Sequence, residues 1–392
     1  MDFDKIIDRR GSLSAKWDNM ESLYGVSPDD GIAMWVADTD FASPDCIQDA
    51  VRKMLDHGVY GYTGTKAEAD YRAAICWWME NRHGWNVDPA AIFTATGLGN
   101  GVGMVLDAYT QPGDGVVLFT PVYHSFARIT RAAGRKVVEC PMVIEDGRYK
   151  MDFDAYGDIL DGSEKVVIFC SPHNPGGAVW TVEEQQQVVT FCRKHDLLLV
   201  SDEIHHDLVY PGHKHIPMPL AAPDCDDILI MLTASSKTFN IAGTHTGNVI
   251  IPNAKLRAAY ADRSSAINLS SNSFGVAMTT AAYSPEGAAW VDELVSYLDG
   301  NRQAFETGLS AIPGVKPMTL GATYLSWVNF SGTGMNDAEI KDRIFKQAKV
   351  APNYGETFGT GGENFMRFNL GTARANIDEA VARLQSAFSD LQ

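Results

Sequence analysis

The sequence contains no uninterrupted apolar run of about 18 residues, the length that a membrane-spanning helix requires. Its first residues, MDFDKIIDRRG, are polar and include acidic side chains, unlike the start of a signal peptide. The six cysteines are scattered and form no CxxC pair, which is typical of reduced thiols rather than of a disulfide framework. These absences argue against a membrane or secreted protein and predict a cytoplasmic one.

Basic residues are also scarce, because 32 lysines and arginines stand against 49 aspartates and glutamates and give a formal net charge of −17. Such a charge argues against nucleic acid or an anionic membrane as a partner. It does not argue against a small anionic cofactor, which local dipoles can hold. The length of 392 residues and the hydrophobic content of 45% are typical of a globular metabolic protein with one or two domains.

Short apolar runs bounded by turn residues recur through the middle of the chain. They are rich in β-branched residues and nearly continuous, as expected of strands buried on both faces of a sheet. Helical patterns lie between some of them, for example at 181–195, where Thr181 and Glu184 have capping-box spacing. This alternation predicts an α/β fold with an at least partly parallel sheet. The predicted strands are 115–120, 136–140, 165–170, 197–202, 228–233 and 247–251.

Polar segments follow three of these runs. The run 165–170 leads into SPHNPGG, LLLV into SDEIHHD, and 228–233 into ASSK. Because ligands bind beyond the carboxyl ends of the strands in such sheets, we expect these segments to gather around one site. From about residue 285 the pattern changes to amphipathic helices with a few shorter strands, which predicts a smaller second domain.

Lys237 lies among hydroxyl residues directly after a predicted strand. On composition alone, a solvated loop lysine would be the simpler interpretation. Ser235, Ser236 and the N–H groups of a following helix suit a phosphate, however, and Asp202 ends a strand of the same sheet. Pyridoxal 5′-phosphate requires such a set, because a lysine binds it as a Schiff base and a carboxylate keeps its ring nitrogen protonated.

Four segments, SPHNPGG, SDEIHHDLVY, ASSKTFNIAG and FMRFNLGTAR, occur in this order. Together they resemble fold-type I pyridoxal-phosphate enzymes of the aspartate aminotransferase superfamily. VADTDFASP, YGYT and TYLSW add a resemblance to its MalY/PatB-type C–S lyases (cystathionine β-lyases), over essentially the whole chain. The resemblance implies the aspartate aminotransferase-like fold: a large cofactor-binding domain with a mostly parallel sheet (46–284) and a smaller α+β domain (285–392). The segment 1–45 is expected to contribute to the small domain.

The resemblance also implies roles for single residues. Lys237 matches the Schiff-base lysine and Asp202 the partner of the ring nitrogen. Asn174 matches the asparagine that binds the phenolic oxygen, and Tyr123 the aromatic residue over the ring, although singly they also suit a turn and a core position. Arg367 matches the arginine that grips the substrate α-carboxylate, for which a planar guanidinium is suited because it donates two parallel hydrogen bonds.

Further matches concern the cofactor phosphate and a second subunit. Tyr62 matches a tyrosine that reaches the phosphate and the substrate across the interface of a homodimer. Leu98 and Gly99 match backbone N–H donors to the phosphate at a helix start. A dinucleotide site is not indicated, because Val102 stands where GxGxxG needs its third glycine, while a packing role for these glycines stays open. His205 stands near the phenolic oxygen, where aminotransferases usually place a tyrosine.

Histidines and acids cluster near the middle of the sequence and raise the question of a zinc site. The family pattern already contains DEIH and GHKHIP without metal, so we predict none. The residues concerned are Asp202, His205, His206, Asp207, His213 and His215.

Three positions depart from the aminotransferase pattern. Ala234 replaces a serine that commonly binds the phosphate, and the loop 354–359 (YGETFG) differs on the substrate side. His245 stands in place of a phosphate-binding arginine that lyases of this type also lack, which favours a lyase. We therefore expect a C–S β-lyase that cleaves cystathionine or related S-substituted L-cysteines to a thiol, pyruvate and ammonia. The alternatives are an aminotransferase with the same residues, or a regulatory or binding protein that retains the fold.

Overall fold

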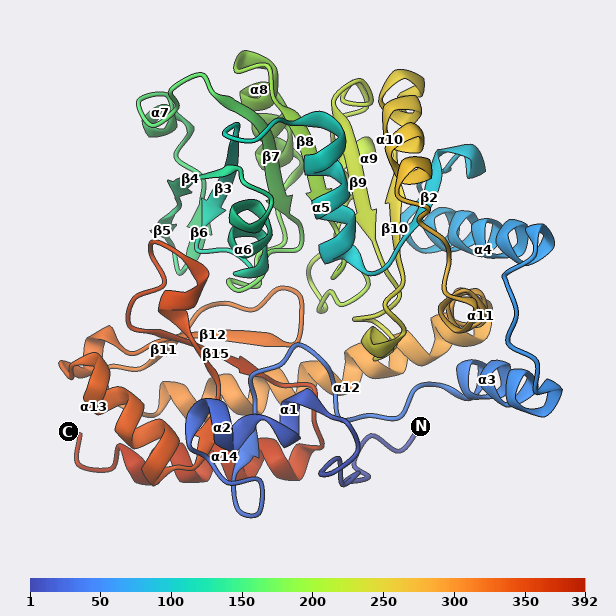
Figure 1. Ribbon diagram of the computed structural model, residues 1–392. Coiled ribbons are helices and arrows are strands. Elements are labelled where there is room, and N and C mark those ends of the chain that lie inside the picture. Colours follow the sequence, from blue (N-terminus) through green and yellow to red (C-terminus); the bar gives the residue numbers. More distant parts are fainter. Residues whose placement is uncertain (392) are drawn as a thin grey trace.

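A seven-stranded sheet forms the centre of the larger part of the molecule in the computed structural model, which describes residues 1–391 (Figure 1). Strand β10 runs antiparallel to both of its neighbours, and the other neighbouring pairs are parallel. The mostly parallel α/β sheet is thus confirmed, and the short strand β2 was not predicted. In spatial order the strands are β2 (Ile92–Ala95), β10 (Gly247–Ile250), β9 (Leu229–Thr233), β8 (Leu198–Asp202), β7 (Glu164–Cys170), β3 (Gly115–Thr120) and β4 (Lys136–Pro141).

Both faces of this sheet are buried, which explains the continuous apolar runs. In β3, Val117 and Phe119 belong to one hydrophobic cluster, and Val116 and Leu118 belong to another. The first cluster includes residues of α7 (Phe153–Tyr156), α8 (Val182–Lys194) and α9 (Met218–Ala221). The second includes residues of α5 (Leu98–Tyr109), α6 (Ser125–Ala132) and α10 (Ala254–Ala266).

The start of α8 confirms the predicted capping box. Thr181 Oγ1 accepts a hydrogen bond from Glu184 N at 3.2 Å, and Glu184 Oε2 accepts one from Thr181 N at 2.9 Å.

The smaller part of the molecule contains an antiparallel sheet and the long helix α12 (Figure 1). Helices α12 (Pro285–Ser310) and α14 (Arg374–Ala387) pack on each other. The strands are β11 (Lys316–Pro317), β12 (Leu325–Asn329), β15 (Phe365–Asn369) and β14 (Asn353–Tyr354). Between them lie η3 (Ser331–Thr333), α13 (Asp337–Lys341), the π-helical η4 (Asp342–Gln347), β13 (Val350–Ala351) and η5 (Gly355–Phe358).

The N-terminal segment joins this smaller part. Strand β1 (Ile32–Ala33) pairs in parallel with β13, with Ile32 opposite Val350. This pairing supports the division into 1–45, 46–284 and 285–392, which we keep as a proposal. The segment also contains α1 (Ala15–Asp18) and α2 (Met20–Tyr24).

A third group of helices flanks the β2 side of the large sheet (Figure 1). Helix α11 (Ser273–Ala282) packs against α3 (Asp45–His57) and α4 (Thr65–His83). The remaining short elements are η1 (Pro89–Ala91), β5 (Val143–Glu145), β6 (Arg148–Lys150) and η2 (Ala242–Thr244).

A buried ionic cluster fixes the N-terminal segment. The side chain of Lys16 is fully buried, and its Nζ lies 2.9 Å from Asp40 Oδ2. Asp40 also accepts from Arg9 Nη1 at 2.9 Å and from Trp17 Nε1 at 3.1 Å. Burial by itself would raise the pKa of Asp40, but Lys16, Trp17 and Arg9 hold the pKa below its ordinary value.

We expect Lys16→Ala to lower the free energy of unfolding by about 3 kcal/mol, because it leaves a buried carboxylate without one of its two cationic partners. Urea denaturation of the variant measures this loss. The matched control is Lys66→Ala, whose 87% exposed side chain pairs with Asp70 and should contribute less than about 0.5 kcal/mol. Equal, small losses in both variants would contradict a stabilising role for the buried pair.

Candidate active site

Three strand ends of the central sheet bring polar side chains to one cavity of about 160 Å³. Asp202 is the last residue of β8, Asn174 follows β7, and Lys237 follows β9. Because these strands are parallel neighbours, their carboxyl ends meet at one edge of the sheet. The predicted site residues that line this active-site cavity are Leu98, Gly99, Tyr123, Asn174, Asp202, His205, Ser236 and Lys237.

Lys237 is a partly buried amine in this cavity. Its Nζ donates a hydrogen bond to the backbone oxygen of Ala37 at 2.7 Å. Burial lowers the pKa of Lys237 to about 8, although Asp38 and Asp202 act in the opposite direction. At pH 7 roughly a tenth of the amine is therefore unprotonated, as a nucleophile or a base must be, whereas an ordinary lysine is almost fully protonated.

Asp202 lines the same cavity and is buried, with 5% exposure. Burial raises the pKa of its carboxyl to about 7, although the N–H of Ile204, 3.2 Å away, and Lys237 act in the opposite direction. Within the described chain Asp202 forms no ion pair. The carboxyl is thus available to a cationic group of a ligand, which would favour its charged form.

Arg367 on β15 adjoins the cavity and is 2% exposed. Its Nη1 donates to Asn174 Oδ1 and its Nη2 to the Trp35 backbone oxygen, both at 2.9 Å, and Nη2 also donates to Asn353 Oδ1. Burial lowers the pKa of Arg367 to about 10, so the guanidinium stays charged at neutral pH. Its Nε is buried without a partner, and no carboxylate of residues 1–391 pairs with it. Such a guanidinium suits the carboxylate of a ligand.

The start of α5 offers donors on one side of the cavity. Gly97 has φ 84° and directly precedes the helix, which begins at Leu98. The N–H groups of a first helical turn have no partner inside the helix, so those of Leu98 and Gly99 can bind an anion. Next to them, Tyr123 lines the cavity with its aromatic side chain.

His205 lines the cavity as a neutral imidazole. Burial, Lys237 and Arg367 together hold its pKa well below the usual range. Its Nδ1 is buried, and it has no hydrogen-bond partner among the residues that the structure describes.

Besides Arg367, two further predicted residues do not line this cavity. Ser235 is buried, and its Oγ lies 2.9 Å from Thr279 Oγ1, so Ser236 provides the hydroxyl in the cavity. Tyr62 has a relative exposure of 105% and lines a different hollow of about 570 Å³ together with Val59 and Tyr60. The roles predicted for both residues stay predictions.

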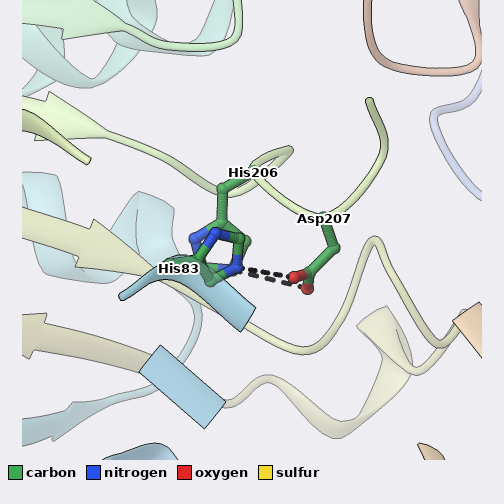
Figure 2. Close-up of side chains that lie close together, drawn as sticks. All are labelled: His83, His206 and Asp207. Atoms are coloured by element: carbon green, nitrogen blue, oxygen red, sulfur yellow. Dashed lines mark hydrogen bonds and ion pairs between the residues drawn. The ribbon is translucent and has the colours of Figure 1, made fainter. Parts of the chain in front are cut away.

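The two histidines of the DEIHHD segment lie in different surroundings, because His205 lines the cavity and His206 does not. His206 and Asp207 meet His83 of α4, as Figure 2 shows, and none of the three lines the cavity. The two imidazole rings stack with centroids 4.2 Å apart and an interplanar angle of 29°. A metal ion lies in the plane of an imidazole that binds it, so stacked rings are poorly oriented to share one ion. Asp207 also accepts from Trp78 Nε1 at 3.0 Å and Thr238 Oγ1 at 2.8 Å, which uses its oxygens in hydrogen bonds.

The sequence did not reveal several contacts around the site. On the N-terminal segment, Lys237 and Arg367 donate to the backbone oxygens of Ala37 and Trp35. Every residue has such an oxygen, so the side chains at these positions gave no signal. Asn353 comes from a two-residue strand without an apolar pattern. The only signal was the VADTDFASP segment, which the resemblance singled out without a role.

The chain belongs to the family described as "Aminotransferase class I and II", whose model matches residues 32–384. It is 40% identical to cystathionine beta-lyase PatB of Bacillus subtilis, over 99% of this chain and 100% of that protein. It is 31% identical to protein MalY of Escherichia coli, over 98% of both chains. The crystal structure of cystalysin from Treponema denticola, which contains a pyridoxal 5′-phosphate cofactor, superposes with a TM-score of 0.93 at 33% identity and covers 100% of this chain and 99% of that chain.

Within residues 1–391, no helix combines the length and the apolar character that crossing a bilayer requires.

The raised pKa of Asp202 predicts a pH-dependent stability of the protein freed of cofactor. The folded protein keeps this proton up to about pH 7, whereas an unfolded chain loses it near pH 4. The folded state therefore binds more protons between these values, and the free energy of unfolding falls as the pH rises.

Asp202→Asn should remove this dependence. We expect the variant to match the wild type near pH 4 and to be more stable at pH 8 by roughly 4 kcal/mol at most. Urea denaturation at both pH values measures the difference. Asp56→Asn, at an exposed position of α3, is the control and should follow the wild type at both values. An Asp202→Asn variant that follows the wild type as well would show that the carboxyl titrates normally.

Proposed function

We propose that this protein is a pyridoxal-5′-phosphate-dependent carbon–sulfur β-lyase that cleaves cystathionine or related S-substituted L-cysteines. The observation that carries the proposal is the meeting of Lys237 and Asp202 in one cavity, with Arg367 beside it. The 40% identity to a protein named cystathionine beta-lyase, over the whole length, favours a lyase over an aminotransferase.

The residues present fit the cofactor. Lys237 Nζ would bind its aldehyde carbon, and Asp202, which has no ion-pair partner in the described chain, would face the ring nitrogen. Asn174 and His205, which line the cavity, would face the phenolic oxygen. The cavity also offers donors to the phosphate, from the N–H groups of Leu98 and Gly99 and from the hydroxyl of Ser236.

When bound, the cofactor supplies an electron-accepting ring that stabilises negative charge at the substrate Cα. Arg367 binds the α-carboxylate and thereby fixes the Cα–H bond relative to the lysine. Lys237 takes the Cα proton at Nζ, for which a pKa of about 8 is well matched to neutral pH. The carboxylate of Asp202 places a negative charge near the protonated ring nitrogen. Over the whole reaction, cystathionine and water give homocysteine, pyruvate and ammonia.

We further propose a homodimer with shared active sites. What supports it is the position of Tyr62, which is fully exposed and lines a hollow apart from the active-site cavity of its own chain. Its hydroxyl is therefore free to serve a second copy. A cytoplasmic location is proposed as well, supported by the six cysteines, which are all free.

We expect the protein loaded with cofactor to release pyruvate, ammonia and homocysteine from cystathionine in equal amounts without any added keto acid. Lys237→Ala should lower kcat by at least about 1000-fold, because the same amine binds the cofactor and moves the proton. Lys165→Ala, at an exposed position of β7, is the control and should keep normal turnover. Turnover that needs a keto acid and leaves the sulfur bonded to carbon would identify an aminotransferase. Cofactor binding without either reaction would identify a binding or regulatory protein.

Mixing two variants, each with a change in a different part of the shared site, tests this proposal. Lys237→Ala and Tyr62→Phe subunits should form hybrid dimers in which one of two sites is intact, so random mixing restores about a quarter of the wild-type rate at most. The control mixture combines Lys237→Ala with Asp202→Asn, since both changes lie in a chain's own cavity and leave no intact site. A protein that sediments as a monomer and still turns over substrate would contradict the proposal. So would a first mixture that recovers no activity.

A further inference from the structure

A second cavity, of about 230 Å³, adjoins the active-site cavity. Tyr123 lines both cavities. Phe358 lines the second one, and its ring centroid lies 4.8 Å from Cζ of Arg367. One layer of side chains thus separates this distal cavity from the arginine that would hold the substrate α-carboxylate. Compared with about 30 Å³ for a water molecule in the liquid, the volume suffices for a group of several heavy atoms.

The charged lining of the distal cavity contains both signs. Helix α6 contributes Arg128 and Arg131, β4 contributes Glu139, and η5 contributes Glu356. A lining with two guanidinium and two carboxylate groups does not select for a simple anion or for an alkyl group. It matches a ligand that carries an ammonium and a carboxylate together.

These charges are only partly paired with one another. Arg128, which is exposed on α6 and lines the cavity, has no ion pair within residues 1–391. Arg131 Nη2 lies 3.9 Å from Glu139 Oε1, which is too long for a hydrogen bond. Glu139 Oε2 accepts from Thr360, which leaves Oε1 for another donor. Glu356 Oε1 accepts from Lys341 Nζ at 2.8 Å, which leaves Oε2 of Glu356 for another donor.

A further unpartnered group belongs to the lining of the distal cavity. His124 lines the distal cavity next to Tyr123 and contacts the Phe358 ring edge-on, with centroids 5.5 Å apart. Its Nδ1 is buried and has no partner in the part of the chain that the structure describes. Because this atom is buried, it does not open into the cavity, and the charged side chains of the lining are the groups that a polar ligand would meet.

We propose that the distal cavity binds the amino-acid end of the leaving group, so that the protein prefers S-substituted cysteines whose thiol product is itself a zwitterion. This proposal rests on the proposed lyase function and names the residues that would select its substrate. Arg128 binds the distal carboxylate, and Glu139 and Glu356 face the distal ammonium. Val122 and Phe358 provide apolar contact for the methylene chain between the two ends.

Three substrates of matched chain length test the proposal with the holoenzyme: L-cystathionine, S-(3-carboxypropyl)-L-cysteine without the distal ammonium, and S-propyl-L-cysteine without either charge. We expect Arg128→Ala to lower kcat/KM for the first two substrates by roughly ten- to a hundredfold. For S-propyl-L-cysteine, kcat/KM should stay within about twofold of the wild-type value. Arg128→Lys should recover part of the loss. Glu356→Gln should lower kcat/KM for cystathionine and leave the carboxypropyl substrate unchanged.

The matched control is Arg72→Ala, because Arg72 is an exposed helical arginine of α4 that likewise forms no ion pair in residues 1–391. It should leave the ratios among the three substrates unchanged. If Arg128→Ala changes all three substrates equally or none of them, the distal site is overturned while the lyase function stands. If the wild-type protein releases pyruvate from none of the three, the lyase function fails, and the distal site fails with it.

Discussion

The backbone between Trp35 and Thr39 is the constraint on which the active site depends. Its carbonyl oxygens accept from Arg367 at Trp35 and from Lys237 at Ala37, so one short segment touches both cationic groups. The side chain of Asn240, three residues after the lysine, donates to Thr39 O at 2.8 Å and accepts from Thr39 N at 3.0 Å. The segment therefore links the large and the small sheet, and its position sets the distance between the amine and the guanidinium.

Burial gives these groups their chemistry. It moves the pKa of Lys237 down to about 8 and that of Asp202 up to about 7, so both groups can change protonation near neutral pH. Arg367 remains charged in the same surroundings, with a pKa of about 10. A chain with a net charge of −17 can thus still hold anionic ligands, because the local cations and the start of α5 act over a few ångströms in a region with little screening.

Sequence patterns predicted the parts of this site that depend on local order. The apolar run before Asp202 identified a buried strand, and the carboxyl ends of neighbouring strands led to the cavity that Asn174 and Lys237 share. The segments around these residues were specific enough to indicate the family. Contacts made by backbone oxygens left no trace in the side-chain pattern, as at Ala37. The meeting of His83 with Asp207 was also hidden, because it depends on how α4 packs against a loop 124 positions away in the sequence. Neither propensity nor periodicity describes such packing.

The residues closest to the chemistry do not by themselves distinguish a lyase from an aminotransferase, since both reactions use an amine, an acid and a carboxylate grip. Selection among substrates must come from groups farther along the side chain of the substrate. The loop 354–359 is one place where the sequence departs from the aminotransferase pattern, and it supplies Glu356 and Phe358 to the distal cavity. On the opposite side, Arg128 lies on α6, the helix that begins two residues after Tyr123. The same helix and loop thus connect Tyr123 to the distal charges, so the leaving group can be selected without any change at Lys237, Asp202 or Arg367.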